Sequence, residues 1–167
     1  MAGEEDTKWP VPANGPGEVL CAADIARILE RIPHRYPFVL VDRLLECTPM
    51  KSARALKNVS RSEPFFDGFD QADLRMPQML LVEAMAQTCA LLCSFSVSGH
   101  ARYIFAGIDN CRFGMAVVPG DQLILEAVTV RMARGYGRYH ARALVEGALA
   151  SEADLVAVVV QRPERAT

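Results

Sequence analysis

The pattern of apolar and polar positions changes sharply near the middle of the chain. Residues 79–97 are apolar almost throughout, with Glu83 and Gln87 as the first polar side chains. A helix that is apolar on nearly all sides is either buried at the centre of a protein or spans a membrane. Glu83 in the first turns and the lack of a basic flank favour the buried helix. Pro77 suits the first position of this helix, because its missing N–H would be unpaired there anyway.

On both sides of this helix, apolar and polar positions alternate, which is typical of half-buried strands. We expect strands at residues 38–47, 52–59, 103–108, 122–132, 138–146 and 155–161. A short amphipathic helix at residues 25–32 precedes them, capped by Asp24 and ended by Pro33. One long buried helix among about six antiparallel strands predicts an α+β fold, with a curled antiparallel sheet wrapped around the central helix.

Length and composition fit this single domain. The chain has 167 residues, of which 51% are hydrophobic, enough for a sizeable core. Residues 1–18 hold three prolines and three glycines, so we predict a flexible N-terminal tail at residues 1–20 and one domain at residues 21–167. The net charge of −2 gives no indication of nucleic-acid or membrane binding. No signal peptide is recognisable, which makes the cytoplasm the default location.

The five cysteines lack the paired short spacings of a disulfide framework. Cys89 and Cys93 lie at i and i+4 on the central helix, where both could contact a metal ion. No pair of His or Cys follows at ligand spacing. We therefore expect these cysteines in the core, and expect neither a metal nor a cofactor.

Glu83 is the first candidate for chemistry, because a carboxylate in a buried helix must be paired, protonated or functional. Its surroundings resemble a known family. Four segments are similar to the 3-hydroxyacyl-acyl-carrier-protein dehydratases of the FabZ and FabA type, in family order and at family spacing. They are PHRYPFVLVDR at residues 33–43, KNVSRSEPFFDG at 57–68, MPQMLLVEAMAQ at 76–87 and FAGIDNCRFGMAVVPGDQLILE at 105–126.

The resemblance covers the chain from about residue 24 to its end. It implies the hotdog fold, a homodimer or hexamer, and an acyl tunnel between protomers. It also implies a substrate carried as a thioester of acyl carrier protein or coenzyme A, in fatty-acid or related acyl-chain synthesis. Ala106, Gly107 and Ile108 match the strand that lines the tunnel, and glycine there permits close approach of a ligand or of another backbone.

The catalytic positions match only in part. The family loop reads roughly G-H-F-P-G-x-P-V-M-P-G, and residues 68–78 read GFDQADLRMPQ without a gap. Glu83 falls on the family's catalytic acid, while Phe69 falls on its catalytic histidine and cannot exchange a proton. Gln78 replaces a glycine whose backbone N–H polarises the thioester carbonyl, and it keeps an N–H for that role. We therefore expect slow dehydration by the chain alone, increased by Phe69→His.

Other ionisable residues offer weaker candidates. His34 is expected to hydrogen-bond the loop near the tunnel rather than to catalyse. His100 and His140 are expected at the surface, the latter without an acidic partner in its motif. Asp70 and Asp73 stand in the altered loop, where a carboxylate either replaces the missing base or stabilises a turn. Arginines could face an acidic acyl carrier protein or simply solvent; these are Arg112, Arg131, Arg134 and Arg138.

Three functions therefore remain open from the sequence. The first is an acyl-thioester-handling dehydratase. The second is a non-catalytic subunit that contributes Glu83 to a composite site, as a heterodimer with a histidine-bearing paralogue. The third is a hotdog thioesterase, in which a lone helix carboxylate activates water.

Overall fold

The computed structural model describes residues 23–68, 70, 73–95, 102–133 and 135–160. Its helices are α1 (Ile25–Arg31), the 3-10 helix η1 (Pro64–Phe66) and α2 (Gln78–Ser94). Its strands are β1 (Arg43–Thr48), β2 (Ser52–Asn58), β3 (Arg102–Phe113), β4 (Gln122–Ala133), β5 (Tyr136–Val145) and β6 (Ala148–Val160). The predicted tail at residues 1–20 lies outside the described residues.

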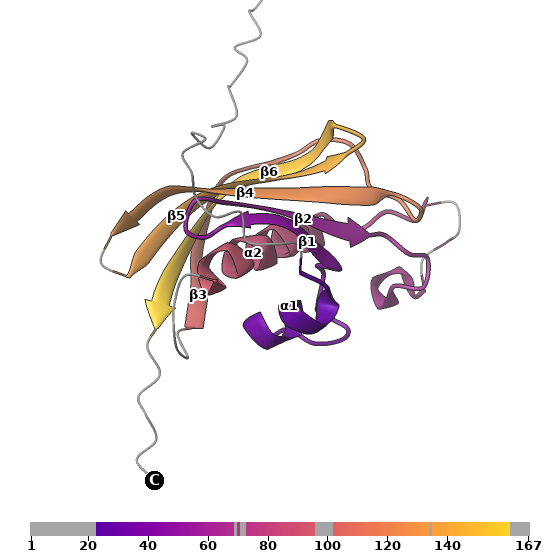
Figure 1. The fold of residues 1–167 in the computed structure, drawn as a ribbon. Coiled ribbons are helices and arrows are strands. Elements are labelled where there is room, and N and C mark those ends of the chain that lie inside the picture. Colours follow the sequence, from indigo (N-terminus) through magenta and orange to yellow (C-terminus); the bar gives the residue numbers. More distant parts are fainter. Residues whose placement is uncertain (1–22, 69, 71–72, 96–101, 134, 161–167) are drawn as a thin grey trace, which may run out of the picture.

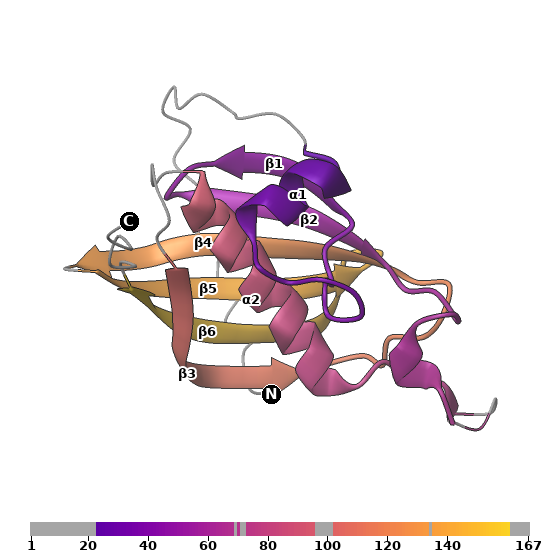
Figure 2. The same cartoon turned by 90° about the horizontal axis from the view of Figure 1, so that it is seen from below.

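The described strands form one antiparallel sheet in the order β1-β2-β4-β5-β6-β3. The sheet curves around α2, which crosses its concave face, and α1 lies beside α2 (Figure 1). Figure 2 shows α2 running obliquely across the strands. The predicted α+β fold with a sheet wrapped around a central helix is confirmed.

Burial explains why α2 carries so few polar residues. The helix begins at Gln78. Pro77 is therefore the N-cap residue, one position before the first helical position that was predicted for it. Most of the helix is buried, from Leu81 to Cys93. Cys89 and Cys93 are in this core as expected, and the Cys93 thiol lies 2.9 Å from the Tyr139 hydroxyl. No helix in the described part of the chain is long and apolar enough to cross a membrane.

The first strand begins later than the alternation predicts. Residues 38–42 form a loop over α2, and β1 starts at Arg43. In this loop the Gln87 side chain bonds the backbone of Phe38 and Leu40, groups that would pair with a neighbouring strand if the segment were a strand. The alternation of apolar and polar residues contains no information on a hydrogen bond between a helix side chain and a distant loop.

β3 is longer than predicted and lies at an edge of the sheet. It pairs only with β6, and its register shifts between Phe105 and Gly107 and again between Asp109 and Arg112. Such bulges bend a strand, and Figure 2 shows β3 turning sharply along its length. Its outer edge therefore has no strand partner among the described residues.

Candidate active site

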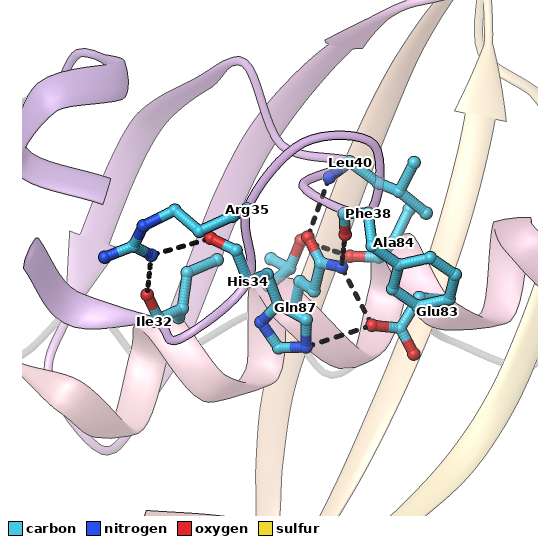
Figure 3. A network of polar contacts seen from close by, with 9 residues as sticks. Ile32, His34, Arg35, Phe38, Leu40, Glu83, Ala84 and Gln87 are labelled. Atoms are coloured by element: carbon cyan, nitrogen blue, oxygen red, sulfur yellow. Dashed lines mark hydrogen bonds and ion pairs between the residues drawn. The ribbon is translucent and has the colours of Figure 1, made fainter. Parts of the chain in front are cut away.

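Glu83 lies in the second turn of α2, near the helix end that follows the altered loop in sequence. Its side chain is 26% exposed, so it is held by the protein yet open on one side. Oε1 accepts a hydrogen bond of 2.8 Å from Gln87 Nε2 and lies 3.3 Å from His34 Nε2. The other oxygen, Oε2, points away from both partners (Figure 3).

Gln87 orients this carboxylate from one turn further along the helix. The i, i+4 spacing places the two side chains next to each other on one helix face. Gln87 is 1% exposed; its Nε2 also donates to Phe38 O at 2.7 Å, and its Oε1 accepts from Leu40 N–H at 2.8 Å. A single buried amide thus fixes both Glu83 and the 38–40 loop.

His34 comes from the loop that follows α1, and its imidazole reaches Glu83 (Figure 3). The loop is folded tightly, because Arg35 Nη1 donates to Ile32 O at 2.9 Å and to His34 O at 2.7 Å. His34 Nδ1 is buried and has no hydrogen-bond partner among the described residues. The structure thus places His34 next to the candidate catalytic acid, a contact that the expected role of bonding the loop near the tunnel does not include.

The altered loop is described only in part. Phe69 lies outside the described residues, as do residues 71–72. Asp73 N–H donates to Asp70 O at 3.1 Å, and the Asp73 carboxylate pairs with Arg75 at 2.7 Å with both side chains exposed. Asp73 is therefore engaged in a surface turn rather than directed at Glu83.

A buried ion pair anchors the start of this loop, and the sequence patterns did not indicate it. Lys57 on β2 is 1% exposed, and its Nζ lies 2.5 Å from Glu63 Oε1 and 3.3 Å from Asn58 O. Next to Glu63, η1 places the Phe66 ring in the core. The only feature of the sequence that points to this pair is a lysine at an inward-facing position of a strand. A buried ammonium group requires a partner, so such a lysine implies a nearby acidic residue.

Gln78, the proposed carbonyl-binding position, is the first residue of α2 and is exposed. The first N–H groups of a helix have no partner within the helix, and the helix dipole makes them good donors to a negative oxygen. With a rise of about 1.5 Å per residue, Gln78 lies about 7.5 Å along the axis from Glu83. The two residues therefore belong to the same end of α2.

The residues matched to the tunnel strand lie on β3, at the open edge of the sheet. Ala106 occupies the bulge between Phe105 and Gly107, and Ile108 is 45% exposed. A Cβ atom built on Gly107 would meet only Val156 Cβ, at 3.8 Å, which is ordinary contact. Packing among the described residues therefore does not require glycine at this position.

The remaining candidates that the structure describes lie on strands β3, β4 and β5. The acidic partner of His140 lies outside its local motif: His140 Nδ1 is 2.8 Å from Asp154 on the neighbouring strand β6. Strand pairing brings His140 opposite Asp154, a relation that the local motif does not contain. Arg138 also pairs with Asp154, at 3.1 Å, and Arg112 pairs with Glu152. Arg131 is exposed, and Arg134 and His100 lie outside the described residues.

The curved sheet around α2 is that of the hotdog proteins. A hot-dog-like protein from Thermanaerovibrio acidaminovorans aligns with a TM-score of 0.58 at 16% identity, covering 68% of this chain and 84% of that one. "The Dehydratase Heterocomplex ApeI:P from Xenorhabdus doucetiae" aligns with a TM-score of 0.69 at 16% identity, covering 81% of this chain and 91% of that one. These likenesses establish the fold.

Sequence comparison defines the family. The model of the FabA-like domain matches residues 32–154. The 3-hydroxyacyl-[acyl-carrier-protein] dehydratase FabZ of Polynucleobacter asymbioticus is 49% identical over 140 residues, covering 83% of this chain and 93% of that protein. The protein of the same name from Chromobacterium violaceum is 46% identical over 136 residues, covering 80% and 91%. The chain belongs to the FabZ-type branch of the FabA-like family.

Proposed function

We propose that this protein removes water from 3-hydroxyacyl thioesters, with Glu83 as the acid that protonates the departing hydroxyl. The observation that supports this most is the placement of Glu83. The buried Gln87 orients its carboxylate through Oε1, while Oε2 points away from both Gln87 and His34 (Figure 3). A general acid needs this combination of fixed position and access to the reacting oxygen. The names of the relatives agree with this reaction.

The start of α2 supports binding of the thioester itself. In the proposed complex, the Gln78 N–H donates to the thioester carbonyl, whose oxygen gains negative charge as the C2 proton leaves. The acyl carrier is acyl carrier protein or coenzyme A. The acyl chain extends along β3, past Ala106, Gly107 and Ile108.

The open edge of β3 supports a homodimer. Large apolar side chains are exposed on and after this strand: Ile104 at 53%, Ile108 at 45% and Met115 at 41%. A long edge strand of this kind usually has to be covered. A second copy pairing along β3 covers these side chains and encloses an acyl site, and a hexamer made of such dimers is compatible with the same contact.

The test is an assay of the purified protein with 3-hydroxyacyl and enoyl thioesters of both carriers. We expect interconversion of the two, and a loss of about 10² to 10⁴-fold in rate for Glu83→Gln. Glu30→Gln, on the exposed side of α1, is the matched control and should retain activity. Hydrolysis of the thioester in place of dehydration, or full activity in Glu83→Gln, would contradict the proposal. Turnover that requires an added histidine-bearing paralogue would indicate a composite site.

A further inference from the structure

The dehydration step needs a base, and one imidazole already touches the proposed acid. His34 Nε2 lies 3.3 Å from Glu83 Oε1, and the two side chains are 28% and 26% exposed. Both groups are therefore accessible from one side while the protein holds them from the other. Among the described residues, His34 is the only histidine in contact with Glu83.

The two ring nitrogens of His34 have different surroundings. Nδ1 is buried and lacks a hydrogen-bond partner among the described residues, whereas Nε2 faces the carboxylate. Buried polar atoms are nearly always paired, and an unpaired one in a native structure calls for an explanation. A histidine that serves only to brace a loop gains from pairing both nitrogens. In His34, a single nitrogen is directed at the reactive group.

The chain around His34 is fixed at both ends. Arg35 binds the carbonyls of Ile32 and His34 on one side, and Gln87 binds Phe38 and Leu40 on the other (Figure 3). The same Gln87 holds Glu83. One network therefore positions the imidazole and the carboxyl together, and such preorganisation lowers the cost of bringing catalytic groups into place.

We propose that His34 is the general base of this protein and replaces the loop histidine that relatives carry at the position of Phe69. This inference rests on the proposed dehydration. Nε2 takes a proton from C2 of the 3-hydroxyacyl thioester, and the electron pair of that C–H bond forms the C2=C3 double bond. The C3–O bond breaks, and the departing hydroxyl takes a proton from Glu83 and leaves as water.

After the reaction, His34 and Glu83 can return to their starting protonation states without a third group. After the step, His34 holds one additional proton and Glu83 lacks one, and transfer between Nε2 and the carboxylate restores the starting state. Hydration of an enoyl thioester runs through the same positions in reverse.

The experiment separates proton removal from overall turnover. We would measure two quantities for the wild-type protein: the rate of enoyl thioester formation, and the exchange of C2 hydrogen of a 3-hydroxyacyl thioester in deuterium oxide. The same measurements would be made for His34→Gln, for His34→Ala with and without added imidazole, and for Phe69→His. His140→Gln, on β5, is the matched control for loss of a histidine.

We expect His34→Gln to lose about 10² to 10⁴-fold in both rates, which is the usual contribution of a general base. Imidazole should restore part of the exchange in His34→Ala, because the small molecule can occupy the vacated space, whereas a histidine that only braces the loop would not be replaced in this way. His140→Gln should retain both rates. Circular dichroism of each variant verifies that the fold is kept.

Other outcomes overturn the inference in distinguishable ways. If the wild type is active and a folded His34→Gln keeps its rate to within threefold, His34 is not the base, although the proposed function stands. The same holds if imidazole restores nothing to an inactive His34→Ala. If only Phe69→His is active, the wild-type chain does not carry out the reaction, and both the proposed function and the role of His34 fail. If the wild type and all variants leave both thioesters unchanged, the proposed function itself fails, and the role of His34 fails with it.

Discussion

Gln87 is the residue on which the geometry at Glu83 depends most. It is an uncharged side chain in a core helix, and it makes three hydrogen bonds to groups far apart in the sequence. Replacing it with the similarly sized Met leaves the Leu40 N–H buried without a partner, and frees Glu83 and the loop that bears His34. We expect Gln87→Met to destabilise the fold by about 2 kcal/mol, since each unpaired buried group costs about 1–3 kcal/mol.

Urea unfolding measures this loss, and the dehydration assay should show a fall in rate that is larger at kcat than at KM. Gln122→Met is the control, because Gln122 is an exposed residue of β4 whose side chain bonds only Asn58 among the described residues. Such surface changes usually stay within about 0.5 kcal/mol. Equal losses of stability and of dehydration rate in the two variants would show that the hydrogen bonds of Gln87 do not hold Glu83 and the 38–40 loop in place.

At the scale of elements, the pair between β2 and the segment before η1 ties the altered loop to the sheet. Lys57 is nearly inaccessible, whereas the Glu63 side chain is 20% exposed. Removing the carboxylate in Glu63→Ala leaves a buried ammonium group uncompensated, which typically costs about 3 kcal/mol. Removing the ammonium in Lys57→Met leaves a carboxylate that can still reach water, so we expect a smaller loss, below about 1 kcal/mol.

Urea unfolding of the two single variants and the double variant tests this asymmetry. The unfolding free energy of the double variant should be close to that of Lys57→Met, because neither variant leaves an unpaired charge buried in the core. A loss in Lys57→Met as large as that in Glu63→Ala would mean that the pair contributes through its attraction rather than through compensation of a buried charge.

A second polar cluster links the neighbouring strands β5, β6 and β3 and should make stability depend on pH. Burial of Asp154 tends to raise its pKa, but hydrogen bonds from His140, Asn110 and Arg138 outweigh this and hold the pKa below its ordinary value of 3.8. A carboxyl whose pKa is lower in the folded state adds stability above its unfolded value, and this stability is lost as the pH falls through the folded value.

We therefore expect the difference in unfolding free energy between wild type and Asp154→Asn to be constant near neutral pH and to shrink below about pH 4. Urea unfolding at several pH values measures it. Asp109→Asn is a suitable control, because the Asp109 side chain is 57% exposed and contacts Arg138 only at 3.5 Å. If the difference in unfolding free energy between wild type and Asp154→Asn grew as the pH fell, the pKa of Asp154 would not be lowered in the folded protein.

The sequence predicts those elements that depend on interactions between residues close together in the chain. The apolar run of α2, the alternation in the strands and the cap at Asp24 each follow from nearby residues, and all appear in the structure. The loop at residues 38–42, the bulges of β3 and the partner of His140 depend on contacts between distant segments. The same holds within the site: Glu83 stands out in the sequence as a carboxylate in an apolar helix, whereas the approach of His34 requires the folded loop.

At the scale of the whole molecule, the single chain leaves its edge strand β3 open, and the proposed second copy closes it. Ile108 is exposed on this strand, and a charge there would have to be buried on association. We expect the wild type to be a dimer or a larger assembly at micromolar concentration. Ile108→Asp should weaken association by about a hundredfold or more, equivalent to about 2.7 kcal/mol.

Light scattering at several concentrations measures the assembly, and the dehydration assay at the same concentrations shows whether activity follows it. Val130→Asp provides the comparison: Val130 is 57% exposed on β4, which β5 and β6 separate from β3. This variant should keep the wild-type mass and rate. A folded, stable wild-type monomer would refute the homodimer. An Ile108→Asp variant that stays assembled and active would place the contact elsewhere, because a buried aspartate at a packed strand edge could not be tolerated without loss of affinity.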